Sequence, residues 1–219
     1  MPSDRMFVGA EHEFHDPAFA RQWADRFVPT APRQHLFDLV CEQLQRRAGP
    51  DDHIVELGIG PGYMARHLLE RLPRCTYEGV DFSEAMHALA KRTIGDRMSR
   101  VTLTLADLLD DQWPSRLSRQ PAAIVSTWSL HDLGSEPAVA GVYARCGSLL
   151  APGAVLVNGD FIKPDGTRHD YEAGRFSIGR HLEHLRAAGF RDARCLAHLE
   201  PDIEDPTAAQ NYACLVAVK

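Results

Sequence analysis

The chain has 219 residues, of which 44% are hydrophobic and 25% are charged, so it can bury the core of one globular domain. Its formal net charge is −6, and no run rich in lysine or arginine occurs. This composition argues against nucleic acid or an anionic membrane as a partner. It says nothing about the oligomeric state.

The five cysteines are scattered along the chain and form no C-x-x-C pair. A disulfide framework or a zinc site is therefore not expected, and a reducing compartment suits the chain. Residues Met1–Glu13 lack the apolar core of a signal peptide, and no stretch approaches the roughly 20 apolar residues of a membrane span. We expect a cytoplasmic protein.

Two helices are expected between Pro17 and Ala48, with Pro29 and Pro32 separating them. The first helix carries aromatic residues at four-residue spacing, namely Phe19, Trp23 and Phe27. Such a stripe is explained by core packing, or alternatively by a helix that acts as a lid over a binding site.

From Ile54 onward, short apolar runs alternate with helical patterns. Strands are expected at Ile54–Leu57, Thr76–Val80, Val101–Ala106, Ala122–Thr127 and Ala154–Phe161. Helices are expected at Tyr63–Arg71, from Glu84 to about Thr93 behind the N-cap Ser83, and at Pro137–Leu150. This alternation predicts βαβ units and a parallel sheet with both faces covered.

The last segment has a different pattern. A helix is expected at Phe176–Ala188, followed by strands at Arg191–His198 and Tyr212–Val218. The acidic, proline-containing stretch Glu200–Pro206 joins these strands and has no room for a helix, so the two strands should pair as an antiparallel hairpin.

The glycine-rich turn after the first strand is the strongest local signal for a ligand. Gly58, Gly60 and Gly62 occupy alternate positions behind the carboxylate of Glu56. Glycine tolerates positive φ and lets a backbone approach a ligand closely. Because ligands of parallel sheets bind beyond the carboxyl ends of the strands, we expect other residues that follow strands to line the same rim.

Several motifs in order resemble those of class I S-adenosylmethionine-dependent methyltransferases. Glu56–Gly62 resembles their glycine-rich first motif, Gly79–Met86 their second, and Ala106–Leu108 their third. Leu149–Ala154 resembles the turn before their fifth strand. The resemblance extends from about Asp51 to Lys219.

The resemblance implies an α/β fold: a doubly wound, mostly parallel seven-stranded sheet with a C-terminal antiparallel hairpin and an N-terminal helical cap. It divides the chain into a helical cap or lid at 1–50 and an S-adenosylmethionine-binding methyltransferase domain at 51–219. It also implies S-adenosyl-L-methionine as cofactor.

The resemblance gives roles to individual residues. Asp81 would accept hydrogen bonds from the ribose hydroxyls, and Asp107 from the adenine amino group, while Phe82 and Leu108 pack on the adenine. The expected cofactor-binding residues are Glu56, Gly58, Gly60, Gly62, Asp81, Phe82, Asp107, Leu108, Thr127 and Trp128. Arg26 is a weaker candidate for the cofactor carboxylate.

The expected reaction is in-line displacement of the methyl group by a nitrogen or oxygen atom of a small-molecule acceptor. His131 is the candidate general base, because histidine titrates near neutrality. A purely structural role of His131 in hydrogen bonding its loop is the alternative. The expected acceptor contacts are Trp23, His169, Tyr171 and Arg175.

Metal dependence is not expected, since Asp132, Asn158 and Asp160 match a catechol-type metal site poorly. His181 and His184 are expected at the surface.

Two other functions stay open. A nicotinamide-dependent oxidoreductase would carry G-x-G-x-x-G, but Tyr63 occupies the place of the last glycine. A non-catalytic S-adenosylmethionine-binding module would keep the glycine turn without turnover.

Overall fold

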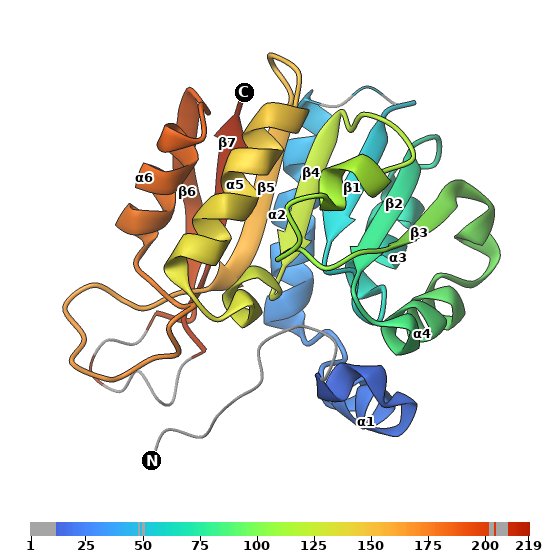
Figure 1. Cartoon of the computed structure of the whole chain (residues 1–219), viewed down its shortest axis with the longest axis horizontal. Helices are drawn as coiled ribbons and strands as arrows, with labels where there is room; N and C mark the ends of the chain where they lie inside the picture. Colours follow the sequence, from blue (N-terminus) through green and yellow to red (C-terminus); the bar gives the residue numbers. More distant parts are fainter. Residues whose placement is uncertain (1–11, 48, 50, 202–203, 205–209) are drawn as a thin grey trace.

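The computed structural model describes residues 12–47, 49, 51–201, 204 and 210–219. These residues form a seven-stranded sheet in the order β3-β2-β1-β4-β5-β7-β6 (Figure 1). The strands are β1 (His53–Leu57), β2 (Thr76–Asp81), β3 (Val101–Leu105), β4 (Ala123–Thr127), β5 (Val155–Phe161), β6 (Asp192–Leu199) and β7 (Tyr212–Val218). The helices are α1 (Pro17–Arg26), α2 (Ala31–Arg47), α3 (Tyr63–Arg71), α4 (Glu84–Ile94), α5 (Glu136–Leu149) and α6 (Ile178–Ala187).

The sheet confirms the predicted fold class. Strands β1 to β5 pair in parallel, whereas β7 runs antiparallel between β5 and β6. The hairpin predicted at the end of the chain is therefore present, and its last strand occupies an interior position. Most of the connection predicted at Glu200–Pro206 lies outside the described residues.

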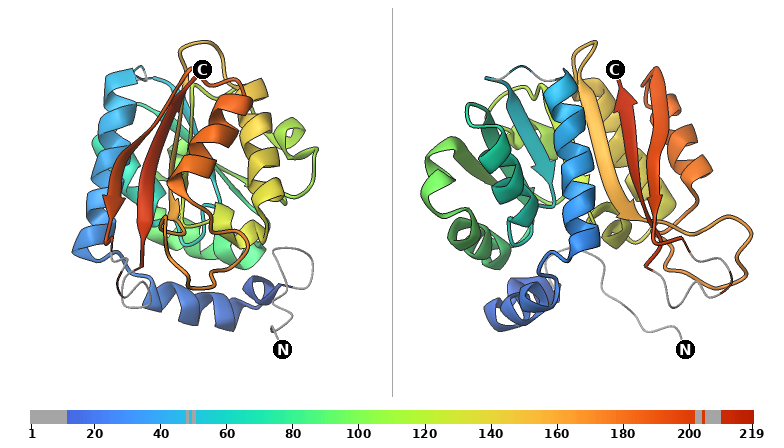
Figure 2. Two further views of the ribbon diagram at one scale, coloured as in Figure 1. Left: turned by 90° about the vertical axis from the view of Figure 1, so that its left-hand side faces the viewer. Right: turned by 180° about the vertical axis from the view of Figure 1, so that it is seen from behind.

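Helices cover both faces of the sheet (Figure 2). Apolar side chains of α2, α3 and α4 share one buried cluster with the strands, and those of α5 and α6 share another. The strands β1, β4 and β5 are buried at every position or nearly so, which explains their continuous apolar runs.

Local capping explains where the helices begin. The hydroxyl of Ser83 accepts a hydrogen bond from the amide of Met86 at 3.2 Å, as its N-cap position predicts. Asp16 caps α1 in the same way. Pro32 does not separate the first two helices as expected, because it is the second residue of α2. The first turn of a helix needs no donor from that position, so proline is tolerated there.

The two N-terminal helices have different surroundings. Helix α2 packs against β5, β7 and α3, so it belongs to one layer of the domain. Helix α1 lies beyond the carboxyl ends of the parallel strands, next to α4 (Figures 1 and 2). Residues 1–11, which include most of the segment searched for a signal peptide, lie outside the described residues. The cap at 1–50 and the domain boundary after it stay predictions.

His181 is not at the surface as expected but buried in α6, at 1% exposure. Its Nδ1 lies 2.9 Å from the hydroxyl of Tyr143, and its ring stacks on Phe176. Burial lowers the pKa of His181 to about 4, so the ring is neutral. The hydroxyl of Tyr143 in α5 is the polar partner that allows this burial. The spacing of His181 and His184 in the sequence does not reveal such a partner.

In the described part of the chain, no helix has both the length and the apolar character to cross a membrane. All five cysteines are unpaired.

Candidate functional site

The glycine turn leaves β1 at the rim formed by the strand ends. The amides of Gly58 and Ile59 both donate to the carbonyl of Val80, at 2.9 and 3.0 Å, which binds the turn to the end of β2. Gly58 has φ of +71°, and a Cβ there would lie 1.9 Å from the hydroxyl of Ser129. Only glycine fits this position, because both the conformation and the close approach exclude a side chain.

Gly60 faces open space instead. A Cβ at this residue would meet no atom within 4 Å. Its amide donates to Asp81 Oδ2 at 2.9 Å. Gly62 forms the N-cap of α3 and lies away from the cleft lining. The turn therefore presents bare backbone toward the cleft while Asp81 holds it in place.

Asp81 ends β2 and is 6% exposed. Its Oδ1 accepts from the amide of Ser83 at 3.0 Å, so each oxygen has one backbone donor. Burial raises the pKa of Asp81 to about 6, although these backbone hydrogen bonds oppose the shift. The carboxylate retains lone pairs that can accept from a ligand.

Glu56 lies below the glycine turn and is 1% exposed. Burial raises its pKa to about 8; the hydrogen bond from the hydroxyl of Tyr77, at 2.8 Å, acts in the opposite direction, and the charge of Asp81 adds to the rise. Glu56 and Asp81 thus form a pair of buried acids at one wall of the cleft.

A cleft of about 950 Å³ of empty space, partly open to solvent, lies over this turn. Its lining residues come from the N-terminal segment, both N-terminal helices and the ends of β1, β2, β3 and β4. They are Phe14, Trp23, Phe27, Pro29, Arg33, Phe37, Glu56, Gly58, Ile59, Gly60, Pro61, Tyr63, Met64, Asp81, Phe82, Met86, Ala106, Asp107, Leu108, Thr127, Trp128, Ser129, Asp132 and Leu133.

Asp107 follows β3 and contributes a half-buried carboxylate to the cleft. Its Oδ1 accepts from the amide of Leu109 at 2.8 Å, which fixes the side chain in a local turn. The second oxygen has room to accept a hydrogen bond from a ligand.

The wall opposite the acids is aromatic. Trp23 and Phe27 of the α1 segment stack with ring centroids 4.3 Å apart. The guanidinium of Arg33 lies 4.6 Å from the centroid of Phe27 and 5.5 Å from that of Trp128. Trp128 adopts a positive φ of 46°, which is uncommon for a bulky residue and marks a constrained turn after β4.

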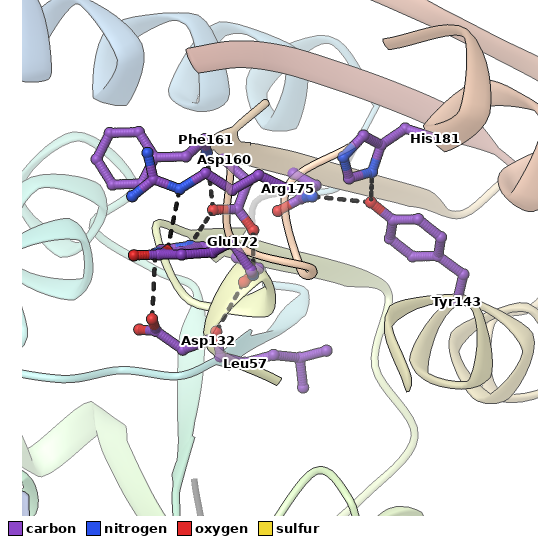
Figure 3. A network of polar contacts seen from close by, with 11 residues as sticks. Leu57, Asp132, Tyr143, Asp160, Phe161, Glu172, Arg175 and His181 are labelled. Atoms are coloured by element: carbon purple, nitrogen blue, oxygen red, sulfur yellow. Dashed lines mark hydrogen bonds and ion pairs between the residues drawn. The ribbon is translucent and has the colours of Figure 1, made fainter. Parts of the chain in front are cut away.

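His131 lies in the turn Leu130–Leu133 behind the cleft lining and is 7% exposed. Its Nδ1 is 2.7 Å from Asp160 Oδ1, and its Nε2 is 3.2 Å from Asp132 Oδ1. Figure 3 shows these two carboxylates within one network that also includes Arg175. Burial alone would lower the pKa of His131, but the two carboxylates raise it overall. Asp132, by contrast, lines the cleft.

Three of the predicted acceptor contacts lie outside the cleft lining. Arg175 is 4.4 Å from the ring centroid of Phe161 and pairs with Glu172 at 3.2 Å, in the network of Figure 3. His169 and Tyr171 contact each other edge to face, at 5.0 Å between centroids. The structure thus groups Arg175 with His131, while the other two form a separate contact.

The structure places most predicted site residues together. Of the expected cofactor residues, all but Gly62 line the cleft, as does Trp23. His131, His169, Tyr171 and Arg175 do not. Arg26 is exposed and away from the lining, whereas Arg33 was missed because nothing in its neighbourhood forms a motif. Within the described ranges, no cluster of three His, Cys, Asp or Glu side chains has the arrangement of a metal site.

The strand order, with β7 antiparallel between β5 and β6, is that of the Rossmann-like fold found in methyltransferases. Residues 54–153 match a family described as a methyltransferase domain. This match covers just under half of the chain, which over these residues is similar to methyltransferase domains.

Three curated relatives bear the name trans-aconitate 2-methyltransferase. That of Acidovorax sp. (strain JS42) is 38% identical over 141 residues, which are 64% of this chain and 47% of the relative. That of Delftia acidovorans (strain DSM 14801 / SPH-1) is 34% identical over 106 residues, which are 48% of this chain and 36% of the relative. The match thus spans about half or less of the length of these proteins.

Solved structures share the fold at low sequence identity. An O-methyltransferase family protein from Burkholderia thailandensis superimposes with a TM-score of 0.71 at 17% identity, covering 94% of this chain and 60% of the other. Human N-acetylserotonin methyltransferase, solved in complex with S-adenosylmethionine, gives 0.67 at 16% identity, covering 97% and 60%.

Proposed function

We propose that this protein transfers the methyl group of S-adenosylmethionine to a nitrogen or oxygen atom of a small-molecule acceptor by in-line displacement. The observation that carries the proposal is the placement of Gly58, Gly60, Asp81 and Asp107 around one cleft. These residues come from three strand ends that are distant in sequence.

The donor set of the cleft fits S-adenosylmethionine. Asp81 and Asp107 each offer a free acceptor position for ribose hydroxyls and for an exocyclic amine. Phe82 and Leu108 line the cleft beside them and can cover an adenine ring. Glu56 lies near the turn, but its raised pKa of about 8 keeps it protonated at neutral pH, so the negative charge there comes from Asp81. When bound, the cofactor supplies an activated methyl group.

This chain's residues then have two tasks: to orient the acceptor and to keep water away. The aromatic residues Trp23, Phe27 and Trp128 make one wall apolar, which serves both tasks. His169, Tyr171 and Arg175 stay predicted acceptor contacts; their positions outside the lining give them no direct support.

His131 stays the candidate general base for an acceptor that must lose a proton. Asp160 contacts one ring nitrogen and can fix the ring, while Asp132 lies between the other nitrogen and the cleft. A proton from the acceptor would therefore reach Asp132 first, or His131 after Asp132 rotates. The structural alternative, in which His131 only holds its turn, predicts a His131→Gln variant with unchanged pH dependence of kcat.

Trans-aconitate is the first acceptor to test, because three curated relatives carry its name. The runner-up function is a module that binds the cofactor without turnover. Formation of S-adenosylhomocysteine in the presence of trans-aconitate and a panel of small hydroxy and amino compounds separates the two functions.

Calorimetry decides the cofactor. We expect S-adenosylmethionine and S-adenosylhomocysteine to bind and NAD to show no heat of binding. Binding of NAD without binding of S-adenosylmethionine would overturn the proposal in favour of an oxidoreductase.

A further inference from the structure

Arg33 is the one lysine or arginine among the described residues that line the cleft. It lies in the first turn of α2 and is 8% exposed. Arginine stays charged in proteins, so this wall of the cleft contains a buried cation. Buried charges ordinarily have a partner, because desolvation without one is costly.

No carboxylate of the described residues forms an ion pair or a hydrogen bond with the Arg33 guanidinium. Glu200 is close enough to influence its pKa but does not contact it. The rings of Phe27 and Trp128 are its neighbours instead, at 4.6 and 5.5 Å. The aromatic faces stabilise the cation but do not replace an anionic partner for its N–H donors, and the described residues supply none.

Two further donors without partners lie on the same side. The indole N–H of Trp128 and the hydroxyl of Tyr212 are buried and have no hydrogen-bond partner among the described residues. Their rings are 5.5 Å apart, and Tyr212 also influences the pKa of Arg33. Burial raises the pKa of Tyr212 to about 12, so its hydroxyl keeps its proton and acts as a donor.

Charge is unevenly distributed around the cleft. Four acids contribute to the lining, namely Glu56, Asp81, Asp107 and Asp132. The glycine-turn side is therefore suited to cationic and hydroxyl groups, whereas the aromatic wall around Arg33 is suited to an anion. The first turn of α2 adds the positive end of a helix dipole.

We propose that Arg33, backed by Phe27, Trp128 and Tyr212, forms a carboxylate-binding subsite in the cleft. Its guanidinium receives the carboxylate through paired N–H···O hydrogen bonds, a geometry for which arginine is suited and lysine is not. The subsite rests on the proposed function and deepens it, because it selects a ligand that carries a negative charge at one end.

Two molecules can bring the carboxylate. The methyl donor has one on its methionyl part, and an acidic acceptor such as trans-aconitate has its own. The distinction is measurable because 5′-methylthioadenosine keeps the nucleoside of the donor but lacks the amino acid part. Trimethyl trans-aconitate likewise keeps the carbon skeleton of the acid but lacks its charges.

The test is calorimetry on wild type, Arg33→Met and Arg33→Lys. S-adenosylhomocysteine and 5′-methylthioadenosine are titrated first, and then trans-aconitate and its trimethyl ester into the S-adenosylhomocysteine complex. If the donor brings the carboxylate, Arg33→Met binds S-adenosylhomocysteine about 10- to 100-fold more weakly and 5′-methylthioadenosine as wild type does. If the acceptor brings it, only the affinity for trans-aconitate falls, and the ester is not affected.

Arg46→Met is the matched control, because Arg46 lies in the same helix and is exposed, with Glu42 as its partner. It should bind all ligands as wild type does. Arg33→Lys keeps the charge and the fold of the turn, and should recover only part of the affinity. The subsite is disproved if Arg33→Met and Arg33→Lys bind both S-adenosylhomocysteine and trans-aconitate as wild type does, including the case in which neither wild type nor variant binds trans-aconitate. Failure of wild type to bind S-adenosylhomocysteine would instead disprove the proposed function.

Discussion

At the scale of single residues, two acids that line the cleft have pKa values raised by burial. Glu56 and Asp81 lie on neighbouring strands and have pKa values of about 8 and about 6. Both side chains therefore change protonation state at pH values that are ordinarily used for experiments on proteins. Stability and ligand affinity should both respond to pH because of these two side chains.

Glu56→Gln should alter the pH dependence of stability. The folded protein keeps the Glu56 proton up to about pH 8, whereas the unfolded chain loses it near the usual value of about 4.5. Between these values the unfolded state binds fewer protons, so the free energy of unfolding of wild type falls as pH rises. Glutamine removes this contribution. The free energy of unfolding of the variant should therefore rise relative to that of wild type by up to about 1.4 kcal/mol for each pH unit.

Urea denaturation at pH 5.5 and pH 8 measures this difference. The exposed Glu42→Gln is the control, since its carboxylate lies at the surface beside Arg46. Equal pH slopes for wild type and Glu56→Gln would show that Glu56 is ionised throughout.

Asp81→Asn should weaken S-adenosylhomocysteine binding by about 1–3 kcal/mol at pH 8, because a charged acceptor is replaced by a neutral group. In wild type the affinity should also fall as pH drops through about 6, where Asp81 takes up a proton. The variant should lack this drop. Calorimetry at pH 5, 6.5 and 8 provides the measurement, with exposed Asp165→Asn as control. An unchanged affinity in Asp81→Asn would remove Asp81 from the site.

The sequence was informative about site residues that belong to motifs and uninformative about those that do not. Gly58, Asp81 and Asp107 follow strands, and their placement could be predicted from parallel-sheet topology alone. Arg33 lines the cleft only because the first turn of α2 packs beside Trp128. Such a contact depends on tertiary packing. Likewise, the carboxylates on both sides of His131 come from its own turn and from β5.

At the scale of elements, a buried carboxylate links three strands. Glu78 of β2 contacts His53 of β1 at 3.1 Å, the hydroxyl of Thr104 of β3 at 2.5 Å and the amide of Ser118 at 3.0 Å. Burial alone would raise the pKa of Glu78, but these hydrogen bonds outweigh it and lower the value to about 2. The network therefore favours the ionised form.

Glu78→Gln should destabilise the protein by about 2–3 kcal/mol at pH 7, because the surrounding groups lose the charged carboxylate that they contact in common. Wild type holds this contribution above the ordinary pKa of about 4.5 and loses it as pH falls toward about 2. The gap between the two proteins should therefore shrink in acid. Urea denaturation between pH 7 and pH 3 measures it, with surface Glu183→Gln as control. A gap independent of pH would contradict the proposed ionisation.

The elements themselves could be predicted nearly to the residue where the pattern was regular. Tyr63–Arg71 and Tyr212–Val218 match the structure at both ends. The helix expected at Phe176–Ala188 begins at Ile178 instead, after the N-cap Ser177. Its apolar Phe176 packs on His181 from outside the helix, so hydrophobicity extended the predicted pattern past the cap.

At the scale of the whole molecule, α1 and the segments on either side of it contribute to the lining of the cleft. The hydroxyl of Tyr63 donates to the carbonyl of Ala24 at 3.2 Å, and that of Ser83 donates to the carbonyl of Phe14. Trp23 and Phe14 meet edge to face and both line the cleft. The N-terminal segment is thus attached to α3 and to the start of α4 by few polar contacts.

Binding of S-adenosylhomocysteine should slow hydrogen exchange in α1, since the ligand adds contacts to the face that α1 turns toward the cleft. Tyr63→Phe should speed exchange there in the free protein. Amides of α6, on the far face of the sheet, serve as the internal reference. Exchange in α1 that does not respond to ligand would argue against a lid.

Two of the three tryptophans, Trp23 and Trp128, line the cleft, and the third, Trp113, is fully buried in the cluster on the opposite face of the sheet. The protein therefore has its own optical reporter. A ligand that enters the cleft should shift or quench the fluorescence of Trp23 and Trp128, while emission from Trp113 provides a constant background. Single Trp→Phe variants would then locate each ligand along the aromatic wall without any attached dye.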